Sequence, residues 1–210
     1  MFKSRFRQYG YESSRLRRLS PTTNVTLTNL VSNGDFSNGT TGWTAYRGNG
    51  SVADNTYKLT ADGTQLYAYV FQSIAAPTIG RLYALTFRVR VTNENCRTLR
   101  YRYGTAVTVD IQNPVNNTWY QRTIIITANS TYSDLTLYQY YVDADTANGK
   151  VMEVQYVSCV DITALEAALG RAITDAQMAM IMNLYDGWFN GSVNLSWFDL
   201  IMTIVNSLHP

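Results

Sequence analysis

Apolar and polar residues alternate along most of the chain, which is the pattern of half-buried β-strands. Turn-forming clusters of Gly, Asn, Asp and Ser interrupt this pattern about every 8–12 residues. Nine segments carry it, at 24–31, 56–61, 65–74, 81–92, 98–105, 106–112, 118–127, 134–144 and 150–160. The pattern shows no helix among them, so it predicts an all-β antiparallel sandwich or barrel rather than βαβ units.

The periodicity becomes helical after Asp161. Thr174 and Gln177 have the spacing of a capping box, and Gly187 marks the end of the helix. One helical face between them is apolar: Met178, Ile181, Met182 and Tyr185. The sequence therefore predicts a short helical appendage behind the β-rich region.

A second helix is predicted over residues 196–208, starting at Ser196. It carries an apolar stripe of Trp197, Leu200, Ile201, Ile204, Val205 and Leu208. Because the β-rich region already supplies its own core, we expect this stripe to contact a partner chain, most simply a second copy in a homo-oligomer. Trp197, Ile201 and Ile204 are its expected interface residues.

Residues 1–24 are basic, polar and aperiodic. Residues 1–20 hold six basic side chains and one acidic one, whereas the whole chain has a net charge of only +2. Aromatic residues are interspersed with the arginines, which favours docking onto a partner protein over binding to nucleic acid. The expected interface residues of this arm are Phe2, Arg5, Phe6, Arg7, Arg15, Arg17 and Arg18.

The composition excludes several classes of function. The only histidine is His209, so a Ser-His-Asp or Cys-His catalytic site inside the fold is not expected. Cys96 and Cys159 either pair or stay free, and two cysteines make no structural zinc cluster. The chain has no apolar run long enough for a membrane span and no apolar signal-peptide core, so we expect no membrane partner.

Two stretches carry a resemblance to known families. NLVSNGDFSNGTTGWTAY (29–46) resembles the opening of jelly-roll modules of the carbohydrate-binding type. TANGKVMEVQYVSCVDIT (146–163) resembles a module found in tail and minor structural proteins of tailed bacteriophages of Gram-positive hosts. Residues 165–178 and 184–191 match the layout of that family's helical motif, but the Gly-Asn-Glu-Pro part is missing.

The resemblance implies a jelly-roll β-sandwich at 25–162, between the basic N-terminal arm at 1–24 and a C-terminal helical segment at 163–210. It implies a non-enzymatic virion structural protein, in the tail, neck or capsid surface, anchored by its arm to other virion proteins. The alternative is a glycan-binding module that attaches the particle to the host cell wall. In modules of this type the tryptophan at Trp43 closes one end of the sandwich.

Two groups of side chains are candidate ligand contacts. Tyr67 and Tyr69 share one strand face, as do Tyr138 and Tyr140, and on a concave sheet face they would stack on sugar rings. The other interpretation places them in the core or in subunit contacts. Arg88, Arg90, Arg100 and Arg102 lie on the polar faces of two strands that we expect to be close, where they would bind phosphate or carboxylate, or form ion pairs at an interface.

We expect no cofactor other than a structural calcium. In similar jelly-roll modules the first and last strands are neighbours and often hold calcium, which the resemblance places at Asp35 and Asp161. The alternative for Asp35 is a role in capping its own Asn-Gly turn.

Overall fold

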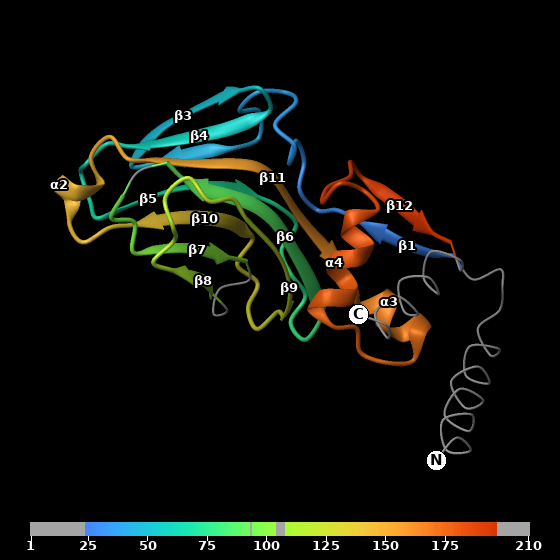
Figure 1. The fold of residues 1–210 in the computed structure, drawn as a ribbon. Helices are drawn as coiled ribbons and strands as arrows, with labels where there is room; N and C mark the ends of the chain where they lie inside the picture. Colours follow the sequence, from blue (N-terminus) through green and yellow to red (C-terminus); the bar gives the residue numbers. More distant parts are fainter. Residues whose placement is uncertain (1–23, 93, 104–107, 197–210) are drawn as a thin grey trace, which may run out of the picture.

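The computed structural model describes residues 24–92, 94–103 and 108–196. Figure 1 shows two packed sheets with a smaller helical end. The strands are β1 (Val25–Thr28), β2 (Thr44–Tyr46), β3 (Gly48–Ala53), β4 (Thr56–Ala61), β5 (Tyr67–Ser73), β6 (Leu82–Val91), β7 (Thr98–Arg102), β8 (Thr108–Gln112), β9 (Tyr120–Thr127), β10 (Asp134–Tyr140), β11 (Val151–Asp161) and β12 (Ser192–Leu195). The helices are α2 (Ala144–Ala147), α3 (Thr163–Leu169) and α4 (Asp175–Asn183).

Ten of the strands form two antiparallel sheets. One sheet has the order β2-β5-β10-β7-β8, and we call it the β5 sheet. The other has the order β3-β4-β11-β6-β9, and we call it the β11 sheet. This architecture confirms the predicted antiparallel jelly-roll β-sandwich.

The alternation in the sequence fixes which side chains face the core. On β6, Phe87 and Val89 are buried between the sheets, whereas Arg88 lies on the outside. On β7, Tyr101 is buried in the same core, and its ring stacks on Phe87 with the ring centres 3.4 Å apart. The inner faces of the two sheets therefore interdigitate, which leaves two separate outer faces.

A β-bulge divides β11 into two parts. Val154 pairs with Val89 and Tyr156 with Arg88, so Gln155 is an extra residue with no partner on β6. Met152 and Val154 face the sandwich core before the bulge, and Val157 and Cys159 face it afterwards. The inward-facing residues have even numbers before the bulge and odd numbers after it. The extra residue in the bulge therefore keeps the apolar side chains of both parts in the core.

A second apolar core lies at the helical end. Val160 of β11 points into it from the outer side of the strand, together with Leu27 of β1 and Leu195 of β12. Met178, Ile181 and Met182 of α4 complete it, as the helical period predicted. The predicted capping box is also confirmed: the Thr174 hydroxyl accepts from the Gln177 amide, and the Gln177 side chain accepts from the Thr174 amide, each at 3.2 Å.

The structure differs from the sequence expectation at several strands. β1 pairs with β12 in a separate ladder, so the first strand of the predicted 25–162 segment lies with the helical end. β3 was not predicted because it is rich in Gly, Asn and Ser. A Cβ at Gly50 would lie 1.9 Å from the Tyr57 hydroxyl, so glycine allows that ring to pack. The short strand β2 and the one-turn helix α2 were missed as well.

The arm and the predicted last helix lie outside the described residues, and with them all their expected interface positions: Phe2, Arg5, Phe6, Arg7, Arg15, Arg17, Arg18, Trp197, Ile201 and Ile204. Both cysteines are free and buried. Burial raises the pKa of the Cys96 thiol to about 11. Within the described part of the chain, no helix is both long and apolar enough to cross a bilayer.

Asn29 connects the two cores. Its side-chain oxygen accepts from the amides of Cys159 (2.9 Å) and Val31 (3.2 Å), and its side-chain nitrogen donates to the Phe189 carbonyl (2.9 Å). Asn29 is 6% exposed, so water cannot readily replace these bonds.

Asn29→Ala should lower the free energy of unfolding by about 1–3 kcal/mol, because it leaves buried backbone groups without partners. The change would be measured as a lower midpoint in urea. Asn38→Ala, at an exposed position of the neighbouring loop, should change stability by less than about 0.5 kcal/mol. Equal effects of the two substitutions would contradict the role assigned to Asn29.

Candidate functional site

The outer surface of the β5 sheet carries a cluster of tyrosines, which we call the tyrosine face. It consists of Tyr46 on β2, Tyr67 and Tyr69 on β5, and Tyr138 and Tyr140 on β10. The strand register places Tyr69 beside both Tyr46 and Tyr138, and Tyr67 beside Tyr140. The structure thus brings together the four predicted tyrosines on one face and adds Tyr46.

The rings of the tyrosine face contact one another. Tyr69 lies with its ring centre 4.7 Å from that of Tyr46 and 4.6 Å from that of Tyr138. Tyr67 lies 5.5 Å from Tyr140 and 6.3 Å from Tyr69. Adjacent strands are about 4.8 Å apart, so the three strands form a continuous aromatic surface about 10 Å wide.

The orientation of these rings differs from the expectation of open aromatic faces. The planes of Tyr46 and Tyr69 are inclined by 26°, and those of Tyr138 and Tyr140 by 22°. Rings that stack on one another cover much of their own faces, so their edges and hydroxyls remain available. No hydrogen bond joins the hydroxyl of Tyr69 or Tyr138 to another of the residues that the structure describes. The tyrosine face therefore offers phenol groups as donors and acceptors between apolar ring edges.

Two phenols of the tyrosine face, those of Tyr69 and Tyr140, have raised pKa values. Burial, together with the neighbouring tyrosines, raises the pKa of Tyr69 to about 12. Burial likewise raises the pKa of Tyr140, although the nearby Arg100 opposes that effect. At neutral pH the hydroxyls of Tyr69 and Tyr140 are therefore uncharged.

The four predicted arginines are not one cluster. β6 and β7 belong to different sheets, so Arg88 and Arg90 lie on the outer face of the β11 sheet, and Arg100 and Arg102 lie on the tyrosine side. β6 and β7 do lie close, since Phe87 and Tyr101 stack across the core. Their polar faces point to opposite outer surfaces, however, because the chain crosses from one sheet to the other between them. A single ligand cannot contact both pairs.

Three arginines border the tyrosine face. Arg100 forms a bidentate ion pair with Asp110, with both N–O distances at 2.8 Å, and lies 5.0 Å from the Tyr140 ring centre. Arg47 lies 5.0 Å from the ring centre of Tyr46 and 5.6 Å from that of Tyr67. Arg102 lies 4.6 Å from the ring centre of Tyr132. Arg47 follows β2 and Tyr132 precedes β10. Both lie in turn regions, so the strand pattern of the sequence did not identify them.

The other pair of arginines takes part in a network on the β11 sheet. Arg90 pairs with Glu153 at 2.6 Å, and Lys58 pairs with the same carboxylate at 3.4 Å. Arg88 and Arg90 both lie over the Trp119 ring, at 5.1 and 4.6 Å from its centre. Arg90 therefore has the ion-pairing role that the sequence analysis kept as an alternative, here within one chain.

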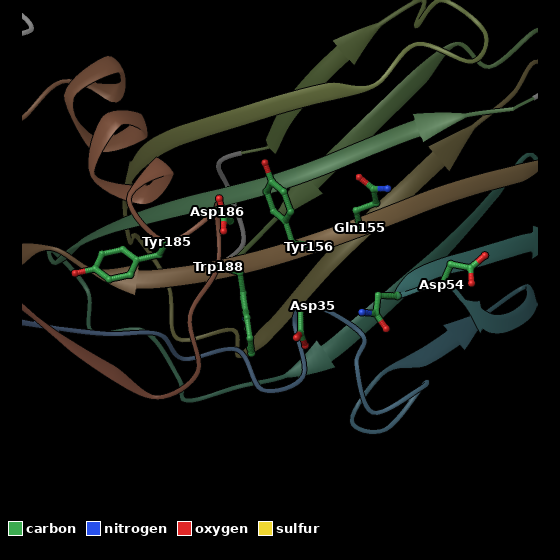
Figure 2. Close-up of a pocket in the computed structure, with 8 residues that line it drawn as sticks. Asp35, Asp54, Gln155, Tyr156, Tyr185, Asp186 and Trp188 are labelled. Carbon is green, nitrogen blue, oxygen red and sulfur yellow. The ribbon is translucent and has the colours of Figure 1, made fainter.

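A hollow of about 390 Å³ lies beside the β11 bulge (Figure 2). Its lining comes from four separate segments: Asp35, Asp54, Asn55, Gln155, Tyr156, Tyr185, Asp186 and Trp188. Asp35 accepts hydrogen bonds from the Ser37 amide (3.3 Å) and hydroxyl (3.0 Å), which is the turn-capping role considered for it.

Asp161, the other residue expected at a calcium site, has partners of its own. It accepts from Arg81 at 2.9 Å and from the Thr163 amide at 3.0 Å. Burial opposes its ionisation, but these two donors outweigh that effect and lower its pKa. Among the described residues, no three His, Cys, Asp or Glu side chains gather where they would hold a metal ion. Calcium binding stays a prediction.

Comparisons with known proteins support the fold. No model of a protein family matches the sequence. No curated protein matches it either. Among solved structures, an arabinose-bound α-L-arabinofuranosidase matches with a TM-score of 0.50 at 9% identity, over 63% of this chain and 26% of that chain.

Two further structures match less well. Tailspike protein 4 of bacteriophage CBA120 matches with a TM-score of 0.45 at 16% identity, over 63% of this chain and 21% of that chain. The N-terminal cellulose-binding domain of the Cellulomonas fimi β-1,4-glucanase C matches with a TM-score of 0.42 at 15% identity, over 57% and 88%. At 9% identity, the match to the arabinofuranosidase concerns the fold alone.

The raised tyrosine pKa values predict sensitivity to alkali. Burial raises the pKa of Tyr101 well above its usual value of 10.0, and Tyr69 titrates near 12. The unfolded chain releases these protons at lower pH, so their contribution to stability is complete below pH 10 and decreases as the pH rises toward 12.

Urea unfolding midpoints should therefore decrease steadily above pH 10, where these tyrosines ionise in the unfolded chain but stay protonated in the folded one. Tyr69→Phe removes one of the titrating groups and should make the decrease shallower. An unfolding midpoint that stays constant through this range would contradict the raised pKa values.

Proposed function

We propose that this chain is a glycan-binding module whose ligand lies on the tyrosine face. The observation that carries the proposal is the continuous aromatic surface across β2, β5 and β10, on which the hydroxyls of Tyr69 and Tyr138 form no hydrogen bond to another described residue. Sugar rings have apolar C–H faces and polar rims, so apolar ring edges interspersed with hydroxyls complement both parts.

The position of the tyrosine face supports this use. The described helices α3 and α4 pack against β1, β6 and β9, at the helical end. Tyr46 is 41% exposed, and Tyr67, Tyr69, Tyr138 and Tyr140 are partly exposed. A glycan therefore has access to this face within the described part of the chain. A cell-wall polysaccharide is a ligand of the proposed class.

A non-catalytic role agrees with the chemistry of the tyrosine face. Its carboxylate Asp110 is held by Arg100 in a bidentate ion pair, and Asp134 bonds to the Ser73 hydroxyl. Both are committed to structural contacts. The module would hold a glycan without cleaving it.

The proposed place of the module is the surface of a bacteriophage particle, in tail, neck or capsid, where it would meet a host wall. That part rests on the sequence resemblance of residues 29–46 and 146–163, and on the basic arm and last helix. The arm and the helix lie outside the described residues, so virion assembly and homo-oligomer formation stay predictions.

Removal of hydroxyls tests the proposal directly. Tyr69→Phe combined with Tyr138→Phe keeps the ring packing and removes two phenol groups. We expect about a tenfold loss of affinity for whichever polysaccharide the native chain retains in affinity gel electrophoresis, since two net hydrogen bonds contribute on the order of 1–3 kcal/mol.

Trp119→Ala is the matched control, because it removes an aromatic ring from the opposite sheet and should leave retention unchanged. The same variants run on a sizing column distinguish the other interpretation of the tyrosines. A double variant that changes its oligomeric state and not its glycan retention would make the tyrosine face a subunit interface and refute the proposal.

A further inference from the structure

We infer that the tyrosine face selects anionic glycans, through Arg47 and Arg102 at two of its corners. This inference rests on the proposed glycan-binding function and names the class of ligand. The shared chemistry is a carboxylate or phosphate group carried on a sugar chain.

The two guanidinium groups are positioned by tyrosine rings and not by carboxylates. Arg47 lies over Tyr46 and Tyr67, and Arg102 lies over Tyr132. The ion pairs among the described residues include neither arginine, whereas Arg100 between them is paired with Asp110. Cation–π contacts orient a guanidinium without neutralising it, so both side chains retain their full charge for a ligand.

Both arginines also bury a donor that has no acceptor. The Nε atoms of Arg47 and Arg102 are inaccessible to solvent and have no hydrogen-bond partner within the described chain. The Arg47 guanidinium donates a long hydrogen bond, 3.5 Å, from Nη1 to the Thr64 hydroxyl. A buried donor without a partner costs free energy, and since no ligand reaches Nε, an anionic group would bind the Nη nitrogens of each guanidinium.

The backbone at Arg47 adds an independent observation. Arg47 adopts φ = 55°, in the left-handed region that residues other than Gly, Asn and Asp rarely enter. It lies where the chain passes from β2 in one sheet to β3 in the other. A glycine or asparagine would meet this backbone requirement more easily, so a long cationic side chain here points to a role for that side chain.

The carboxylates near this surface do not cancel the two charges. Asp62 is held by Thr64, whose hydroxyl and amide donate to it at 2.7 and 2.9 Å. These hydrogen bonds are the main reason for its lowered pKa, with Arg47 a weaker contributor. Asp134 accepts from the Ser73 hydroxyl. Neither carboxylate forms an ion pair with the arginines.

The spacing of the two cations suits a polymer. Arg47 follows β2, and Arg102 ends β7, with β5 and β10 between them. Three inter-strand steps separate β2 from β7, which is about 14 Å. A ligand that meets both guanidiniums must therefore span the tyrosines between them, as an oligosaccharide with more than one acidic group does.

The test compares charged and uncharged forms of one polymer. Polygalacturonate and its methyl ester share a backbone and differ in charge, and a poly(glycerol phosphate) teichoic acid tests phosphate in place of carboxylate. We expect the native chain to bind at least one anionic polymer about tenfold more tightly than the methyl ester, and to lose that advantage with added salt.

Arg47→Gln combined with Arg102→Gln should abolish the preference for the anionic polymer. Arg88→Gln is the matched control, because Arg88 also lies over an aromatic ring but on the opposite sheet, and it should leave the preference intact. Thermal unfolding of each variant checks that the fold is retained.

Each result decides between the two proposals. Equal binding of the ester and both anionic polymers, or an anionic preference that survives the double substitution, would overturn this inference and leave the proposed glycan-binding function standing. Failure to bind any glycan, neutral or charged, would refute the proposed function itself.

Discussion

The extra residue at Gln155 is the constraint on which the rest of the structure depends. A strand that alternates regularly can place one set of side chains inward, yet β11 has to serve two cores. Because the bulge changes the parity, Met152 and Val157 both face the sandwich, while Val160 points to the helical end. Without this change of register, one of the two cores would lose its central strand.

The same constraint separates the two outer surfaces. Beyond the bulge, Ser158 donates to the Gly187 carbonyl at 3.1 Å, and a Cβ at Gly187 would lie 2.5 Å from the Tyr156 ring. The chain after α4 is thereby fastened to the outside of the β11 sheet. α3 and α4 pack against β1, β6 and β9 and do not cover the outer face of the β5 sheet, so its tyrosines remain partly exposed within the described chain.

Buried amides link the sheets to the connecting segments. Gln139 lies in the core, donates to the Leu59 carbonyl of the opposite sheet at 3.2 Å and accepts from the Tyr141 hydroxyl at 2.9 Å. Gln72 holds the loop after β1 by exchanging hydrogen bonds with Ser32 at 2.9 Å. A buried amide without its hydrogen-bond partners destabilises the fold. These hydrogen bonds therefore favour the one arrangement of the sheets that satisfies them.

Sequence periodicity was sufficient for the strands with β-branched and aromatic residues and for α4, because burial itself imposes their spacing. It failed for β3, where glycines are needed to admit the Tyr57 ring. It also failed for the pairing of β1 with β12, since strands whose paired residues, from Thr28–Ser192 to Val25–Leu195, lie far apart in the sequence leave no local pattern. The tyrosine pairs were identified because alternation reports which residues share a face. The separation of Arg88 from Arg100 was not predicted, because alternation does not report which sheet a strand joins.

The pairing of β1 with β12 has a mechanical consequence. Val25 opposes Leu195, and Thr28 opposes Ser192, so the chain enters and leaves the described fold at neighbouring points. Tension between the two flanking segments would open this ladder one residue pair at a time, like a zipper, instead of shearing all its hydrogen bonds together. The two large sheets lie beyond that ladder and would carry none of the load until it had parted, so a ligand held on the β5 sheet would be shielded from moderate pulling on the chain ends.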